Sequence, residues 1–581
     1  MTNPFIRQFK SALLAGLFVF AAPLTFASTD LDETAGNTGV AGSFLASRIA
    51  LDDNDDDAAV RFLERAISLD KENAKLQQDL FASLVANGRV EDAAALAKRA
   101  RELGNARNLR GYVLAADAMR KRTWKKVPDA LKDVAGVDLD RALREITAAW
   151  GLSGGAQPEQ AMSRLEDLDG PEWIKAMTNY HGGLMAAANG NDELAQTKLQ
   201  AVLDNRAIIS VLTETYIRAV EALVRSHNRS GNREEARQVL DFGLSLLPNH
   251  PPFVQLDAAL NSDKVLKPLL TTPQQGMAEL FYNIATGIRR DGGGNVAKTY
   301  LQLAHFLNPQ SDVVKIGLAE VYLQQQSYEK SNTYYEKLEK TSPFHRLAHL
   351  EMANNLSRLE RNDQAIEQFE HLIEEDPTDI TGYISLGGLY SREERYRDAA
   401  NIYDRAVEQL GEPGRQDWNL FFRRGIAYER LKEWEKAEPN FKQSLELSED
   451  QPEVLNYLGY SWIDQGINLD EGMEMIRKAV ELRPRSGFIV DSLGWAHYRL
   501  GQYEDAVREL ERAVALMPQD PTINDHLGDA YWKVGRKLEA TFQWKIALAS
   551  ETEPENPELI RKKLAEGLNE SNQSAARVEQ D

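Results

Sequence analysis

Apolar residues in the stretch Gly487–Asp520 recur with the spacing of two amphipathic helices joined by a short turn. In its second half, Ala506, Leu510 and Ala513 fall at i, i+4 and i+7, which places them on one face of an α-helix. Gly494 in the first half and the two alanines are small, so two helix backbones can approach closely and pack at interior density. The stretch therefore predicts a helix hairpin that must stack on similar hairpins to bury its faces.

The following segment, Pro521–Pro554, repeats the pattern with the same spacing of small and large residues. Gly528 takes the place of the first small residue, Gly535 falls in the turn, and Ala540 and Trp544 lie on the second helix. This 34-residue spacing resembles the tetratricopeptide repeat, a pair of antiparallel helices. The resemblance implies an all-α fold, a solenoid of stacked helix-turn-helix units that forms a superhelix. A break in the register, described below, adds two arms around an irregular joint to this expectation.

The same register continues along most of the chain and predicts its domain organisation. We expect a signal peptide at 1–27, a flexible segment at 28–39, an N-terminal array of about six divergent units at 40–250, an irregular joint at 251–277, a C-terminal array of eight units at 278–554, a capping helix at 555–568 and a disordered tail at 569–581. The joint is predicted because Pro251, Pro252, Pro268 and Pro273 leave room for only one short helix. A single degenerate repeat is the alternative interpretation of that segment.

The first residues have the pattern of an export signal. Arg7 and Lys10 precede the almost wholly apolar run Ser11–Ala27, which is shorter than a membrane-spanning helix and is broken by Pro23. We therefore expect cleavage near Ser28 and a soluble periplasmic protein, with an uncleaved membrane anchor as the alternative. The chain contains no cysteine, so a lipid anchor attached to a cysteine side chain is not expected.

Charge narrows the classes of partner. The formal net charge of −21 disfavours nucleic acid and anionic lipid surfaces, because binding them requires stripes of Lys and Arg. The acidic run at 52–57, DDNDDD, lacks the glycine and closing glutamate of a calcium loop. It is interpreted instead as an acidic cap on the helix that follows.

The spacings that signal catalysis are missing from the sequence. We find no nucleophile elbow, no phosphate-binding loop and no zinc-binding HExxH pattern. His345 and His349 could share a metal, but no third ligand lies nearby in sequence. The sequence thus predicts a protein that is not an enzyme and holds no cofactor or metal.

The predicted function lies on the surface of the first helix of each hairpin. In repeats of this kind that helix lines the concave side, where a partner protein or peptide would bind. The candidate partner-binding residues of the last four units are Phe422, Arg430, Tyr460, Phe488, Trp495, Tyr498, Arg499, Trp532 and Lys533. Aromatic and Arg side chains commonly anchor interfaces, but the same rings could instead fill the seams between hairpins. The clamp for peptide carboxylates known in the family is not carried over, because its places hold Tyr460, Asp491 and Trp495.

The amino-acid sequence of the last repeats resembles that of exported repeat proteins of Gram-negative bacteria. The segments that carry the resemblance are LNYLGYSWID, DSLGWAHYRLGQYEDA and INDHLGDAYWKVGRKLEA. Among these are adaptors that deliver cell-wall hydrolases to a carboxyl-terminal processing protease. The resemblance implies a periplasmic scaffold or adaptor that presents substrates to an envelope protease. Those adaptors are lipidated and this chain has no cysteine, which leaves the particular protease unassigned. The alternative is a structural subunit of an export or envelope-polysaccharide machine.

Overall fold

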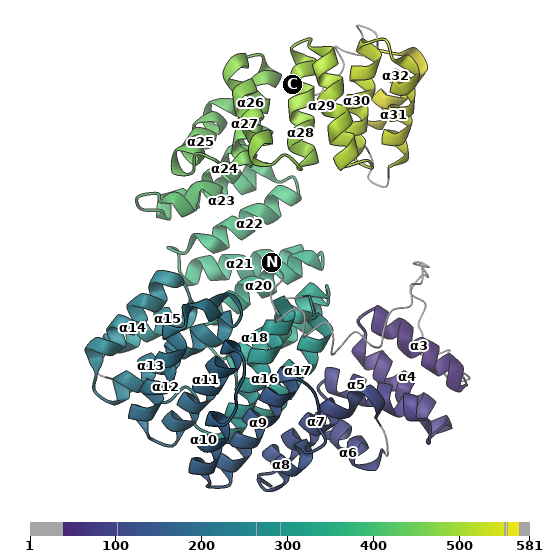
Figure 1. The fold of residues 1–581 in the computed structure, drawn as a ribbon. Helices are drawn as coiled ribbons and strands as arrows, with labels where there is room; N and C mark the ends of the chain where they lie inside the picture. The colour runs from purple at the N-terminus through teal and green to yellow at the C-terminus, as the bar shows by residue number, and fades with distance from the viewer. Residues whose placement is uncertain are drawn as a thin grey trace. The chain divides into compact units, whose positions relative to one another are not determined.

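The computed structural model describes residues 39–100, 103–262, 264–290, 292–550, 554 and 556–568 (Figure 1). Within these ranges every regular element is a helix and no strand occurs, so the predicted all-α solenoid is confirmed. The predicted signal peptide, the flexible segment before Gly39 and the predicted tail from residue 569 lie outside the described residues.

The chain divides into two compact units, the first ending at Arg361 and the second beginning at Asn362. The helices of the first unit are α3 (Val40–Asp52), α4 (Asp56–Leu69), α5 (Ala74–Ala86), α6 (Val90–Arg99), α7 (Arg107–Arg120), α8 (Lys126–Leu131), α9 (Asp138–Gly154), α10 (Pro158–Glu166), α11 (Glu172–Ala188), α12 (Asp192–Asp204), α13 (Thr213–Arg229), α14 (Arg233–Leu246), α15 (Pro251–Leu260), α16 (Pro273–Arg290), α17 (Gly294–Leu307), α18 (Asp312–Gln324), α19 (Tyr328–Tyr335) and α20 (His345–Arg358).

The second unit has the same alternation of first and second helices. Its helices are α21 (Asn362–Glu375), α22 (Ile380–Arg392), α23 (Tyr396–Gln409), α24 (Trp418–Arg430), α25 (Trp434–Leu447), α26 (Pro452–Gln465), α27 (Leu469–Leu482), α28 (Gly487–Arg499), α29 (Tyr503–Leu516), α30 (Pro521–Lys533), α31 (Lys537–Ala549) and α32 (Pro557–Glu566).

The hairpin of α28 and α29 shows how the repeat packs. A Cβ atom added to Gly494 would lie 2.6 Å from Leu510 Cγ, so the first helix approaches the second as closely as a glycine allows. Ala506 and Ala513 are completely buried on the facing side of α29. Gly501 ends the first helix with a φ of +75°, a left-handed conformation that glycine adopts without strain. The small residues identified in the sequence therefore lie at the helix contacts.

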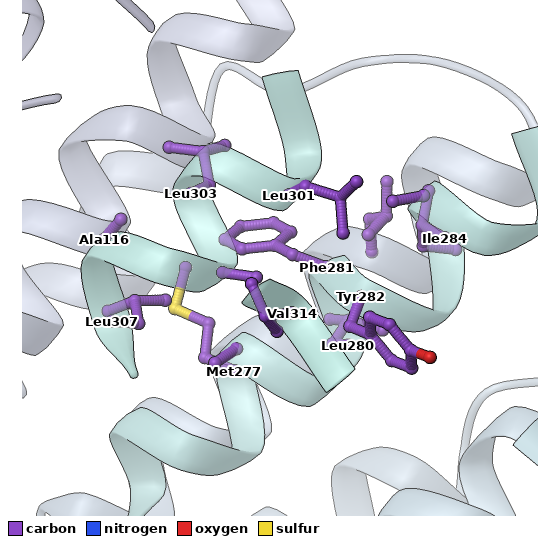
Figure 2. Close-up of a cluster of buried hydrophobic side chains, with 14 of the residues drawn as sticks. Ala116, Met277, Leu280, Phe281, Tyr282, Ile284, Leu301, Leu303, Leu307 and Val314 are labelled. Carbon is purple, nitrogen blue, oxygen red and sulfur yellow. The ribbon is translucent and has the colours of Figure 1, made fainter. Parts of the chain in front are cut away.

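In the first unit, the hairpin of α16 and α17 is surrounded by the first helices of the preceding hairpins. α16 contacts α7, α9, α11 and α13, and α17 contacts α5 and α7. Figure 2 shows Phe281 of α16 among Leu301 and Leu303 of α17 and Val314 of α18, with Ala116 of α7 nearby. The inner face of the N-terminal hairpins is thus filled by later helices of the same chain.

Polar contacts join the same helices across long sequence separations. Lys298 Nζ donates to both carboxylate oxygens of Asp56 at 2.9 Å, and the two side chains are only 3% and 6% exposed. Asp56 belongs to the acidic run at 52–57. The predicted cap is also present, because the Asp55 side chain accepts from the Ala58 N–H at the start of α4. The run therefore caps one helix and holds another.

A second buried network links α11, α13 and α16. The guanidinium of Arg218 donates to both carboxylate oxygens of Glu279, at 2.9 and 2.8 Å, and Tyr180 Oη donates to the same carboxylate at 2.7 Å. Although burial opposes the charged carboxylate, Arg218 lowers the pKa of Glu279. The pair is therefore ionised and fixes α16 inside the first unit.

These contacts place the boundary between the compact units differently from the expected arms. The segment 251–277 contains the short helix α15 and the start of α16, and it lies inside the first unit. The predicted N-terminal array and the units at 278–345 form one compact body, because α16 and α17 are packed among the N-terminal helices. The division falls between α20 and α21.

Candidate partner-binding face

All the predicted binding residues lie on first helices of the second unit. Phe422 and Arg430 are on α24 and Tyr460 is on α26; Phe488, Trp495, Tyr498 and Arg499 are on α28, and Trp532 and Lys533 are on α30. α26 contacts α28, and α28 contacts α30, so these helices lie next to each other (Figure 1). We call the side of α24, α26, α28 and α30 that carries these residues the first-helix face.

The centre of the first-helix face is a stack of three rings. Trp495 lies parallel to Tyr498, with ring centroids 4.6 Å apart and an interplanar angle of 9°. On its other side it stacks on His526 of α30, at 4.0 Å and 16°. Both Trp495 and Tyr498 are half-buried, and burial raises the pKa of Tyr498 well above its ordinary value. The stack is therefore partly a seam between α28 and α30 and partly a surface.

His526 is a part of this site that the sequence reasoning missed. Its Nδ1 lies 3.0 and 3.1 Å from the two carboxylate oxygens of Asp491 on α28. Burial opposes a charged imidazole, but Asp491, with smaller contributions from Asp525 and Asp529, raises the pKa of His526. The stack can thus carry a positive charge on one of its outer rings.

A spacing in the sequence could have identified this contact. Trp495 and His526 are 31 residues apart, and Trp150 and His181, also 31 residues apart, meet in the first unit. There the Trp150 Nε1–H donates to His181 Nδ1 at 3.3 Å. Because the repeat is 34 residues long, this spacing joins neighbouring first helices one turn out of register.

Two of the predicted residues offer the largest exposed surface. Phe488, at the start of α28, has 58% of its surface exposed. Arg430, at the end of α24, is also exposed and lies 3.8 Å from the Glu429 carboxylate. An aromatic ring and a guanidinium are therefore accessible on the first-helix face.

Other rings of the predicted set are packed between helices. Phe422 lies 6.1 Å from Phe441 and 5.9 Å from Tyr457, measured between ring centroids, and Tyr460 packs against the core around Leu455. Trp532 lies 5.5 Å from Trp544, and a Cβ atom on Gly567 would meet its ring at 2.1 Å. Trp532 is thus covered by the end of the last helix.

The two remaining charged residues have partners within the unit. The Arg499 guanidinium pairs with the Asp464 carboxylate and donates to the Asp464 carbonyl at 2.8 Å. Lys533 Nζ lies 5.7 Å from the centroid of the Tyr503 ring. These residues hold α28 to α26 and α30 to α29, so a partner would have to compete for them.

The last helix, α32, closes the array through a buried lysine. Lys563 Nζ donates to Asp525 at 2.9 and 2.8 Å and to Asp529 at 2.8 Å. Although burial opposes the charged ammonium, Asp529 and Asp525 raise the pKa of Lys563. This cluster anchors the helix that covers Trp532.

His345 and His349, the histidine pair considered as metal ligands, meet at the start of α20. The rings of His345 and His349 lie 4.3 Å apart, and no group of three or more His, Asp or Glu side chains in the part of the chain that the structure covers could hold a metal ion. None of the helices described has both the length and the apolar character needed to cross a membrane.

Comparisons with known proteins agree with the repeat architecture. Residues 384–452 match the family described as Tetratricopeptide repeat, and residues 494–535 match the family described as TPR repeat. A TPR repeat-containing protein of Pseudomonas aeruginosa is 28% identical over 164 residues, which are 28% of this chain and 27% of that protein. A BBSome complex member of Bos taurus is 28% identical over 118 residues, 20% of this chain and 21% of that protein.

The solved structure of the APC/C hetero-tetramer Cut9–Hcn1 covers 93% of this chain and 98% of its own, at 13% identity and a TM-score of 0.39. The curated relatives are matched over about a quarter of their length. Stacked helix hairpins and the two family matches define a helical repeat protein. More specifically, residues 384–452 and 494–535 carry tetratricopeptide repeats, and proteins with such repeats generally bind other proteins and typically act as scaffolds without catalysis.

Proposed function

We propose that this chain is a non-catalytic scaffold that binds a partner protein along the first-helix face of its second unit. The observation that supports this proposal most directly is the difference between the two units. In the first unit the first helices of the N-terminal hairpins are covered by α16 and α17. In the second unit the first-helix face keeps Phe488 and Arg430 exposed.

The residues of this face suit a protein partner. An exposed phenylalanine on the same helix as a stack of rings can exclude water from a contact, and an exposed arginine can pair with a carboxylate. The stacked rings of Trp495 and Tyr498 have little conformational freedom to lose on binding, so they would present a rigid surface. Phe488 and Arg430 are the expected anchors, and Trp495 and Tyr498 add half-buried ring surface on the same face.

The location and the partner are proposed on the sequence alone. The pattern of residues 1–27 favours export, and the resemblance of the last repeats favours an envelope adaptor. In this proposal the mature protein acts in the periplasm and presents substrates, such as cell-wall hydrolases, to a carboxyl-terminal processing protease. Intact-mass measurement of the purified protein tests the export step, since retention of residues 1–27 would contradict it.

The binding step is tested by affinity capture with the tagged full chain from envelope extract. We expect the double variant Phe488→Ser, Arg430→Glu to capture about tenfold less partner than the wild type, or less still. Its melting temperature should stay near that of the wild type. Arg508→Glu on α29 is the matched control, because Arg508 is exposed on a second helix. Equal capture by all three proteins would contradict the proposal.

A further inference from the structure

The second helix of the last hairpin, α31, exposes an apolar stripe. On α31, Leu538, Phe542 and Ile546 are 68%, 53% and 39% exposed. Their spacing of four residues places them on one face of the helix. The opposite face is normal for the repeat, because Ala540, Trp544 and Ala547 are completely buried. The stripe is therefore additional to the core of the hairpin.

The same positions of the preceding repeats are polar. When the buried residues of the second helices are aligned, Leu538, Phe542 and Ile546 correspond to Glu504, Arg508 and Arg512 of α29 and to Asp470, Glu474 and Lys478 of α27. These side chains are exposed or half-buried, although both helices have hairpins on either side. Stacking of hairpins does not cover this position, so the stripe is not simply the open end of a solenoid.

The stripe also contains a cation without a carboxylate partner among the described residues. Lys545 Nζ lies 6.0 Å from the centroid of the Phe542 ring, and its side chain is exposed. By contrast, Arg508 pairs with Asp505 and Arg512 with Glu509 on α29. A ligand of the stripe thus gains by placing an acidic group near Lys545.

We infer that the stripe of α31 is a docking site for an amphipathic helix of another protein, one that carries an acidic residue beside its apolar face. Three exposed side chains provide much less area than the roughly 800 Å² per partner that a stable dimer buries, which disfavours a second copy of the chain. A single amphipathic helix that carries its apolar anchors at i and i+4 positions matches the spacing of this stripe. This site lies on a second helix and does not rest on the proposed function.

The probe is a fluorescein-labelled, helix-stapled peptide with leucines at i, i+3, i+4 and i+7 and glutamates beside them. A matched probe carries lysines in place of the glutamates. We expect fluorescence anisotropy to show tighter binding of the glutamate probe to the full chain. Phe542→Ser should weaken that binding at least about tenfold, and Lys545→Glu should transfer the preference to the lysine probe. The control is Arg508→Ser, the corresponding position of α29, which should bind like the wild type.

Other occupants give different results. If light scattering shows a wild-type dimer and a Phe542→Ser monomer, the stripe is a contact between copies and the inference is wrong. If removing residues 569–581 strengthens probe binding at least about tenfold, the chain's own C-terminal residues occupy the stripe and the inference is also wrong. Failure of both probes to bind, or equal binding by wild type and Phe542→Ser, would overturn it as well.

Discussion

At the scale of single residues, Gly276 shows how tightly α16 is held in the first unit. A Cβ atom at this position would lie 2.3 Å from Cε2 of Trp150, a completely packed indole on α9. We expect Gly276→Ala to lower the free energy of unfolding by about 1–3 kcal/mol, because the core must shift to admit the methyl group. Gly294→Ala in α17 is the control, since a Cβ atom there meets nothing within 4 Å. Chemical denaturation of both variants measures the difference, and equal stabilities would mean that α16 does not pack on Trp150.

The contact of His526 with Asp491 predicts a dependence of stability on pH. The pKa of His526 is raised in the folded protein, despite its burial, by Asp491, Asp525 and Asp529. A raised histidine pKa gives stability that is fully present below the unfolded pKa of about 6.5 and is lost as pH rises through the folded pKa. The free energy of unfolding should therefore fall as the pH rises above about 6.5, and His526→Gln should remove this component. Denaturant titrations from that pH upward check it; the same slope in both proteins would exclude His526 as its source.

Sequence reasoning at this scale identified the rings of the first-helix face but not all their surroundings. The repeat predicts both the helix and the position of Trp495 and Tyr498. His526 could have been added from the 31-residue spacing shared with Trp150 and His181. The contact of Gly567 with Trp532 could not be predicted from the sequence. α32 follows the last repeat, so the repeat period does not give the position at which it packs.

At the scale of elements, the hairpin was predictable because its contacts are local and repeat. On α29, Ala506 is completely buried, whereas Ala515 is exposed. We expect Ala506→Leu to lower the free energy of unfolding by about 1–3 kcal/mol through overpacking. Ala515→Leu makes the same chemical change and should cost far less. Urea unfolding of the two variants decides, and similar midpoints would show that the helix faces are assigned incorrectly.

Gln502 illustrates a contact that the pattern alone does not give. It falls in the turn before α29, yet its Oε1 lies 2.6 Å from Nδ1 of the buried His497. A side chain in a turn can therefore satisfy a buried group of the preceding helix, so a substitution of Gln502 would not be a neutral control for Ala506→Leu. Such pairings depend on rotamers rather than on the period of apolar residues.

At the scale of the whole molecule, the first unit depends on contacts between distant parts of the chain. The buried pair of Lys298 and Asp56 is 242 residues apart in sequence, and no period of apolar residues could predict it. Neither could the period show that α16 and α17 fill the inner face of the N-terminal hairpins. The repeat predicts neighbours along the array, whereas this packing depends on how the array curves.

Lys298→Met tests this closure of the first unit. It leaves the Asp56 carboxylate buried without its cation, which should cost about 3–5 kcal/mol. Hydrogen exchange followed by mass spectrometry should become faster in α4 and α17 and stay unchanged from α22 to α30. Arg536→Met is the control, because its pairs with Glu511 and Glu539 are exposed and such pairs contribute about 0–1 kcal/mol. Faster exchange in both units, or in neither, would show that this pair does not close the first unit.

The central claim is that the first-helix face of the second unit binds a partner protein. Site-specific photo-crosslinking in the native cell tests it most directly, with a benzophenone amino acid placed at Phe488 and, as a control, at Arg508. Phe488 is on the first-helix face, and Arg508 is exposed on a second helix. We predict a discrete protein adduct from position 488 that is absent from position 508. No adduct at 488, or the same adduct from both positions, would contradict the account.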